Sequence, residues 1–379
     1  MSMFQKLSEQ TAGADLSNLV YVGTYTQFAG PTGEKAEGIY IFRLDRDTGS
    51  LKLEHVVKDV FNPSFLALHP NRRFLYSVNE AGQINGQPGG GVSAFAVDPQ
   101  TGMLTFINQQ LSKGVDPCYL SVDKSGRCAL VANYGSGNIS LLSISPDGSL
   151  QPAMETIQHV GSGKDPSRQE GPHAHAAVLS PDNRFVFVAD LGTDRVAVYR
   201  LELEVGKLIP CPALDVRVKS GSGPRHLVFH PKGRFVYLVN ELISTLVVYA
   251  FDPEAGKLRE VQVVSTLPEG SFGANLPADV HVASNGRFVY ASNRGQDSIV
   301  MYSVDEDSGR LTCTGHEPTG GNYPRNFAID PTGTFLLAAN QNSGTIRSFW
   351  IDAQTGKLSF TGQVTQVPAP VCIKFFQEA

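Results

Sequence analysis

The sequence predicts an all-β chain folded as one seven-bladed propeller of four-stranded antiparallel blades. Two recurring signatures carry this prediction. The first is an apolar strand, a turn and a second strand ending in Asn or Asp, as in LVFHPKGRFVYLVN (227–240). The second is a strand, an acidic turn with Gly, and a strand opening with Leu. Four-strand units repeated about every 50 residues are typical of propeller blades. The first signature recurs at 65–79, 119–133, 177–190, 227–240, 280–293 and 327–340.

The turns of the second signature suit tight hairpins. In DPQTG (98–102) the Pro presets φ, the Asp accepts hydrogen bonds from turn N–H groups, and Gly102 adopts the left-handed conformation without strain. Val, Ile, Phe and Tyr dominate the flanking strands, and no capped segment with a 3.6-residue apolar period predicts a helix. The turn glycines are Gly49, Gly102, Gly148, Gly206, Gly256, Gly309 and Gly356.

Six copies of the first signature against seven of the second predict how the ring closes. The missing hairpin would join 370–376 (PVCIKFF) to 19–25 (LVYVGTY), near the two ends of the chain. The C-terminal strand is therefore expected to be the innermost strand of a blade whose other three strands are N-terminal, which removes the open edge of the ring. We expect one propeller domain over 19–379 and a loose tail over 1–18. A pair of β-sandwiches would not predict such complementary ends.

The composition argues against several classes of partner. The 379 residues carry a net charge of -5, and so lack the basic surface that nucleic acid or an anionic membrane requires. The five cysteines include no C-x-x-C pair, which indicates free thiols in a reducing compartment. There is no N-terminal signal segment and no apolar run of membrane-spanning length. We therefore expect a cytoplasmic protein without a cofactor or an obligate protein partner.

Polar side chains vary at one rim of the predicted ring. The start of each innermost strand and the end of the next strand lie at the same mouth of the channel, where a ring-shaped scaffold binds small molecules. The residues after the strand-opening proline are Ser64, Cys118, His173, Arg225, Ala278, Arg325 and Val371, and His226, Asp279 and Asn326 stand one position further. The residues after the terminal Asn or Asp are Glu80, Tyr134, Leu191, Glu241, Arg294 and Gln341.

These residue types suit ester chemistry on an anionic small molecule. Arginine and histidine hold phosphate or carboxylate by charge-assisted hydrogen bonds, a carboxylate or imidazole polarises water, and cations steady an oxyanion. The predicted catalytic residues are His173, Arg225 and Glu241. The predicted substrate-binding residues are His175, His226, Arg294, Arg325 and Glu80.

Each candidate also has a structural interpretation. His175 aligns with the core residue Leu227 in this reading of the repeat, and Glu241 can form a purely structural ion pair with Arg225. The terminal Asn and Asp residues are expected to bond backbone within their turns. His173-x-His175 is a candidate metal-ligand pair, but no third ligand stands at a compelling spacing, so we expect no metal. A calcium loop, a Walker A loop and a G-x-S-x-G elbow are all missing from the sequence.

Several motifs around this rim match a known family. They are GPHAH (171–175), SPDNRF (180–185) running into ADLGTD (189–194), and GPRH (223–226) running into VNEL (239–242). The chain resembles the seven-bladed propeller lactonases, which include propeller-type 6-phosphogluconolactonase and fungal carboxy-muconate cyclase. The resemblance covers essentially the whole chain, from YVGTY (21–25) to the closing strand.

The resemblance implies hydrolysis of 6-phospho-D-glucono-1,5-lactone to 6-phosphogluconate, in the pentose phosphate pathway. It implies roles for His173 or His175, for Arg225 and Glu241, and for Arg294 as a further member of the site. In the mechanism we expect, Arg294 and Arg325 bind the phosphate and Arg225 stabilises the oxyanion. Glu241 or His173 removes the proton from the attacking water.

Two other functions compete with this one. Lactonising isomerisation of a muconate-like acid would use the same cationic mouth, but it must move a proton on carbon. A non-enzymatic binding scaffold is the rival from another class. A rim that docks proteins carries exposed aromatic and broad apolar patches, whereas these variable positions are mainly charged and small. The rim therefore favours a small anionic lactone as the partner.

Overall fold

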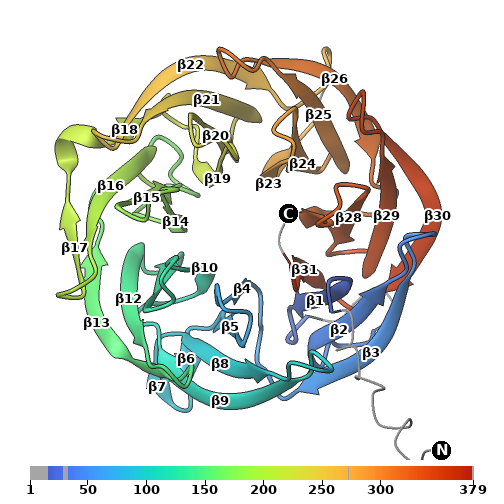
Figure 1. Cartoon of the computed structure of the whole chain (residues 1–379). Coiled ribbons are helices and arrows are strands. Elements are labelled where there is room, and N and C mark those ends of the chain that lie inside the picture. The colour runs from blue at the N-terminus through green and yellow to red at the C-terminus, as the bar shows by residue number, and fades with distance from the viewer. Residues whose placement is uncertain (1–15, 29–32, 272, 378–379) are drawn as a thin grey trace, which may run out of the picture.

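The computed structural model describes residues 16–28, 33–271 and 273–377 and forms a closed ring of seven antiparallel blades around a central channel (Figure 1). Each blade contains a four-stranded sheet whose innermost strand lines the channel. Within these residues the only helical element is the 3₁₀ turn η1 (Pro212–Leu214), and no helix is long and apolar enough to cross a membrane. The predicted fold class is confirmed.

The blades follow one another along the chain. The first contains β4 (Leu66–Leu68), β5 (Phe74–Asn79), β8 (Gly91–Val97) and β9 (Leu104–Leu111), with the small hairpin of β6 (Gln83–Ile84) and β7 (Gln87–Pro88) inserted before β8. The second contains β10 (Pro117–Val122), β11 (Cys128–Asn133), β12 (Asn138–Ile144) and β13 (Leu150–Gln158). The third contains β14 (Ala174–Leu179), β15 (Phe185–Asp190), β16 (Arg195–Glu202) and β17 (Lys207–Pro210), and β18 (Val216–Arg217) also pairs with β16.

The remaining blades complete the ring. The fourth contains β19 (Pro224–Phe229), β20 (Phe235–Asn240), β21 (Thr245–Asp252) and β22 (Lys257–Ser265). The fifth contains β23 (Leu276–Val282), β24 (Phe288–Arg294), β25 (Ser298–Val304) and β26 (Leu311–Pro318). The sixth contains β27 (Pro324–Ile329), β28 (Phe335–Asn340), β29 (Thr345–Ile351) and β30 (Leu358–Gln366). The closing blade contains β31 (Pro370–Phe375), β1 (Leu19–Thr24), β2 (Gly38–Leu44) and β3 (Leu51–Lys58).

The closing blade confirms the predicted pairing of the chain ends. β31 is its innermost strand and runs antiparallel to β1, with Val20 opposite Phe375. The first 15 residues of the predicted tail lie outside the described part of the chain. Leu16 is buried in a core cluster, and Asn18 donates a hydrogen bond to the carbonyl of Leu44.

The turn glycines pack each blade against its neighbour. Gly102 has φ 74°, and the Asp98 carboxylate accepts hydrogen bonds from the turn N–H groups, as predicted. The carbonyl of Gly102 accepts a hydrogen bond from Tyr21 Oη of the adjacent blade, and a Cβ on this glycine would lie 2.1 Å from Leu19 Cδ1. A side chain at this position would therefore strain the backbone and also separate the blades. The same tyrosine contact recurs at Gly148, Gly309 and Gly356.

Candidate active site

Six of the seven innermost strands in the described part of the chain have a bulge near their first residues. In β19, Pro224 pairs with Asn240 and Leu227 pairs with Leu238, so that Arg225 and the residue after it remain unpaired between them. A bulge re-aims side chains and is common beside active sites. The corresponding unpaired residues are Cys118, His175, Ala278 with Asp279, Arg325 and Val371.

This register corrects one part of the sequence alignment. In β14, Ala174 pairs with Asp190 and takes the place that a proline holds in five of the other blades. The predicted alignment of His173 with Arg225, and of His175 with a core residue, is therefore wrong. His175 is the counterpart of Arg225. The alignment took the proline as the start of every innermost strand, but β14 starts two residues after its proline.

Glu241 holds three guanidinium groups at this mouth. It follows β20 directly, and its carboxylate Oε2 lies 3.0 Å from Arg225 Nε and 2.7 Å from Arg294 Nη2. Its Oε1 lies 2.5 Å from Arg168 Nη2. The side chains of Glu241, Arg225 and Arg294 are at most 3% exposed. Removing so many charges from water is costly unless they are closely paired, so this is a built polar site.

The cluster is more cationic than anionic. Burial opposes ionisation of Glu241, but Arg294, Arg225 and Arg168 together outweigh it and lower the pKa of this carboxyl to about 2. Burial, together with the charges of Arg294 and Arg325, lowers the pKa of Arg225 to about 10. At neutral pH one carboxylate therefore faces three guanidinium groups. The excess positive charge favours an anionic ligand.

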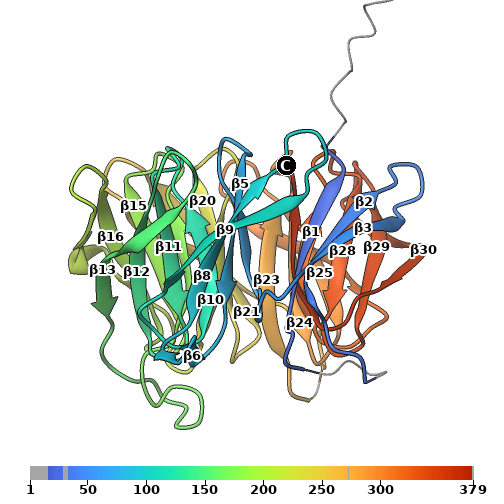
Figure 2. The ribbon, with the colours of Figure 1, turned by 90° about the horizontal axis from the view of Figure 1, so that it is seen from below.

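Arg168 is a site residue that sequence reasoning missed. It lies in the loop between β13 and β14, which projects from one face of the ring (Figure 2, green, at the bottom). Gln169 anchors this loop by donating to the carbonyl of Leu191 and to Asp194 Oδ1. Arg168 also lies 3.3 Å from Tyr134 Oη. The repeat alignment cannot reveal such a residue, because inter-blade loops share no register. The unusual length of this loop is the only sequence signal for it.

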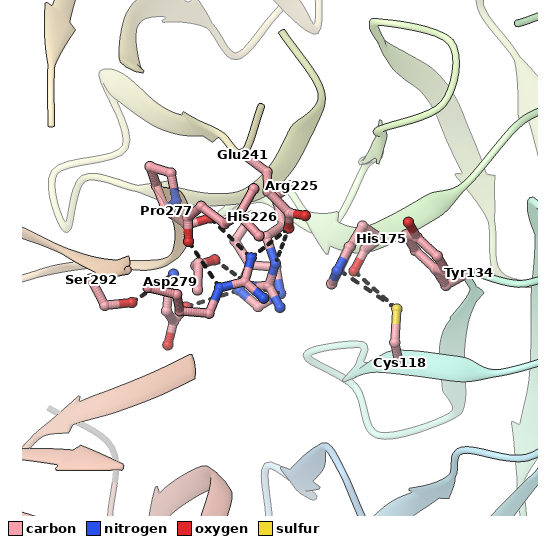
Figure 3. A network of polar contacts seen from close by, with 12 residues as sticks. Cys118, Tyr134, His175, Arg225, His226, Glu241, Pro277, Asp279 and Ser292 are labelled. Carbon is pink, nitrogen blue, oxygen red and sulfur yellow. Dashed lines mark hydrogen bonds and ion pairs between the residues drawn. The ribbon is translucent and has the colours of Figure 1, made fainter. Parts of the chain in front are cut away.

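His226 lies beside Arg225 and is almost fully buried. Its Nε2 is 3.2 Å from Arg225 Nη1, and its Nδ1 is 2.9 Å from Asp279 Oδ1 (Figure 3). Burial, and then the charge of Arg225, lowers the pKa of His226 to about 4. Both ring nitrogens of this predicted substrate-binding residue therefore face protein groups.

His175 lies beside this cluster. Its ring centroid is 5.3 Å from that of His226 and 5.3 Å from that of Tyr134, and its Nδ1 is 3.6 Å from Cys118 Sγ (Figure 3). Burial, followed by the charge of Arg225, lowers the pKa of His175 well below its ordinary value. Its Nε2 has no hydrogen-bond partner among the described residues. A neutral imidazole with one open nitrogen can accept a proton.

His173 is held in the adjoining loop. Its Nδ1 lies 2.9 Å from the carbonyl oxygen of Tyr134 and its Nε2 lies 3.1 Å from Glu170 Oε1. The ring stacks on Tyr134 with centroids 4.5 Å apart. None of its hydrogen bonds within the described chain reaches the arginine cluster.

Arg325 and Glu80 form the other half of the mouth. Glu80 accepts hydrogen bonds from Tyr25 Oη (2.8 Å) and from Ser64 Oγ. The Arg325 guanidinium lies over the Tyr25 ring, 5.4 Å from its centroid, and it has no hydrogen bond or ion pair to another described residue. Burial raises the pKa of Glu80 above its ordinary value, although Arg325 and the two hydroxyl groups oppose this.

The two halves share a small cavity. It is lined by Ser64, Glu80, Cys118, Arg225 and Arg325, among others. A larger cavity of about 560 Å³ is lined by later residues of the innermost strands and by the turns that follow them. Phe65, His226 and Asn326 border both cavities and separate the arginine mouth from the rest of the channel.

This mouth can bind an anion and stabilise a developing oxyanion. It combines buried guanidinium groups, a neutral imidazole and two carboxylates of different basicity. Within the described part of the chain, no three His, Cys, Asp or Glu side chains are arranged to hold a metal ion. The fold and the site together define a propeller with a cationic mouth.

Comparison with known proteins identifies the family. A model of the family "Lactonase, 7-bladed beta-propeller" matches residues 19–375. A 6-phosphogluconolactonase from Bacillus subtilis is 38% identical over 295 residues, which cover 77% of this chain and 79% of that protein. A 6-phosphogluconolactonase from Formosa agariphila is 36% identical over 79% of this chain and 83% of its own length. The structure of a periplasmic gluconolactonase from Pseudomonas aeruginosa superposes with a TM-score of 0.87 at 36% identity, covering 94% of this chain and 98% of the other. The chain belongs to the seven-bladed β-propeller lactonase family.

Proposed function

We propose that this chain is a lactonase that hydrolyses 6-phospho-D-glucono-1,5-lactone to 6-phosphogluconate. The observation that carries the proposal is the charge imbalance at the mouth. Arg168, Arg225, Arg294 and Arg325 face only two carboxylates there, and Glu80 has a raised pKa. Relatives more than 35% identical are named for this reaction.

Arg325 is the best candidate to bind the phosphate. Arg294 is already engaged, because it donates to Glu241 and to the carbonyl of Leu276. Arg325 is part-buried, and its guanidinium only stacks on Tyr25. A bidentate contact with a phosphate would satisfy its donors.

Arg225 suits the oxyanion. Its Nε faces Glu241, and its Nη1 donates to the carbonyl of Ala278 and faces His226. Its Nη2 has no hydrogen-bond partner among the described residues. Because Glu241 and the backbone fix the guanidinium beforehand, it needs no reorganisation when negative charge develops on the lactone oxygen.

We assign the activation of water to His175 rather than to Glu241. Both oxygens of Glu241 are occupied by guanidinium groups, so neither is free to take a proton from water. His175 is neutral and its Nε2 is open. In the step we propose, this nitrogen takes a proton from water while the water oxygen attacks the lactone carbonyl. The intermediate then collapses, the ring C–O bond breaks, and the proton passes to the leaving ring oxygen.

The two rivals fit the site less well. A scaffold that binds proteins has no need of a buried cluster of one carboxylate and three arginines, which costs desolvation energy. Muconate cyclisation would use the same mouth, but no feature of the site favours it over hydrolysis. The cytoplasmic location expected from the sequence stays a prediction.

Proton release tests the proposed function directly, because the product acid ionises at neutral pH. Fresh 6-phosphogluconolactone is added to the protein in a pH-stat, with and without a chelator. We expect release well above the buffer rate and no effect of the chelator. A rate equal to that of buffer would remove this substrate, and a loss of activity with chelator would show that a metal ion takes part.

A further inference from the structure

A buried hydrogen-bond chain leads from Arg225 across three more blades. Arg225 Nη1 faces His226 Nε2 at 3.2 Å, and His226 Nδ1 faces Asp279 Oδ1 at 2.9 Å. Asp279 Oδ2 also faces His281 Nε2 at 2.9 Å and accepts from Asn326 Nδ2. Asn326 Oδ1 in turn accepts from the N–H of Ile373, in the closing strand β31.

The donors and acceptors in this chain fix one tautomer of His226. An arginine only donates hydrogen bonds, so the His226 nitrogen that faces it must be the unprotonated one. The proton then lies on Nδ1 and is donated to Asp279. Asp279 accepts from two groups at each oxygen, since the N–H of Val280 also donates to Oδ1 (3.0 Å). An ionised carboxylate is an acceptor only, and it matches this arrangement.

We propose that His226 and Asp279 are positioning residues for the lactone hydrolysis. Asp279 holds the His226 tautomer whose Nε2 accepts from Arg225, and this contact keeps the guanidinium directed at the substrate carbonyl. The inference rests on the proposed function. It revises the expectation that His226 contacts the substrate.

Burial makes this arrangement matter. His226 and Asp279 are 5% and 4% exposed, so water cannot replace a lost partner easily. Where water is excluded, a guanidinium that points in the wrong direction stabilises the developing oxyanion much less. The hydrogen-bond chain also links Arg225 to β31, the strand that closes the ring, so the position of the guanidinium depends on closure of the ring.

Two substitutions at His226 separate positioning from packing. H226L removes the acceptor for Arg225 and keeps an apolar side chain of moderate size. H226Q keeps an oxygen that can accept from Arg225 Nη1. We expect kcat to fall about 10–100-fold in H226L with KM little changed, because Arg225 loses the contact that directs it and then stabilises the oxyanion less in the transition state. H226Q should restore most of kcat. The matched control is H230Q, directly after the same strand, where the imidazole instead contacts the carbonyl of Gly286; this variant should leave activity unchanged.

A double-mutant cycle then tests whether Asp279 acts through His226. D279A should lower kcat in the wild-type background and have little further effect in the H226L background. Additive losses, or equal activity in H226L and H226Q, would overturn the proposal. Thermal melts of each variant identify any loss of folding, and the two His226 variants carry the test if D279A does not fold.

Nitrogen NMR of the wild-type protein gives a readout that needs no activity. We expect the His226 signals of a neutral imidazole protonated at Nδ1. Protonation at Nε2 would overturn the inference even if the enzyme is active. Conversely, an inactive wild-type protein with the expected tautomer would remove the proposed function and leave this geometry standing.

Discussion

Glu80 and Glu241 occupy the same repeat position on two sides of one mouth, and their surroundings differ. Each follows the terminal Asn of the second strand of its blade. Glu241 faces three guanidinium groups, which outweigh burial and lower its pKa to about 2. Glu80 faces two hydroxyl groups and the charge of Arg325, and burial prevails and raises its pKa. The number of neighbouring cations therefore decides the direction in which the pKa of a buried carboxyl shifts here. In the Glu241 half, the ion pairs fix the positions of the arginines. In the Glu80 half, Arg325 stays available to a ligand.

The largest expected effect comes from the Glu241 half. R225A should lower kcat about 10²–10³-fold, because it removes the donor for the oxyanion. Steady-state kinetics with the phosphorylated lactone measure this. R234A is the matched control, since Arg234 lies in the same blade, stacks on Phe235 and donates to the carbonyl of Glu306. Equal activity of R225A and R234A would contradict the division of the mouth into a catalytic and a binding half.

The histidines next to the Glu241 half should differ in the same way. H175Q should lower kcat about 10²-fold or more, because it removes the proposed base. H173Q should have a small effect, since the His173 ring only links Tyr134 and Glu170. Parallel measurement of kcat in the two variants checks this. The reverse order would return the catalytic role to His173.

The sequence predicts the ring better than it predicts the site. Strand alternation, turn glycines and complementary ends are properties of the repeat, and the closing pair β31 and β1 follows from them. Arg225, Glu241 and Arg294 come together because each sits at a repeat position. His175 was misaligned because the strand β14 lacks the proline that marks its neighbours. Arg168 lies in a loop that the repeat does not constrain.

Replacing each carboxyl by its amide should lower the free energy of unfolding by different amounts in the two halves of the mouth. E241Q leaves three guanidinium groups without their shared counter-charge, and we expect a loss of about 3–5 kcal/mol in the free energy of unfolding. E80Q should cost less than about 1 kcal/mol, since an amide can still accept from the Tyr25 and Ser64 hydroxyl groups. Urea denaturation at pH 7 gives both values. Similar losses in the two variants would show that the surroundings of the carboxyls do not differ as described.

The pH dependence of stability should have opposite signs for the two carboxyls. The folded pKa of Glu241, about 2, is below its unfolded value, so its stabilisation is present above pH 4.5 and is lost as the pH falls toward 2. Linkage puts this loss at about 3 kcal/mol. The folded pKa of Glu80 is raised, so its contribution is greatest at low pH and is lost as the pH rises through that pKa. Stability is measured by denaturation of the wild type, E241Q and E80Q over a range of about pH 2 to pH 7. The slope due to Glu241 should vanish in E241Q, and the opposite slope due to Glu80 should vanish in E80Q.

The smallest effect should be confined to binding and come from Arg325. R325A should raise KM for the phosphorylated lactone about 10-fold and leave kcat nearly unchanged, because a charge-assisted contact made equally in the ground state and the transition state is lost. Unphosphorylated glucono-1,5-lactone is the internal control, since it has no phosphate to lose, and its KM should stay the same in the variant. An equal rise in KM for both lactones would place Arg325 on the sugar ring instead, and a fall in kcat would move it into the catalytic half. The ratio of the two KM changes therefore measures how much of the contribution of Arg325 to binding depends on the phosphate group.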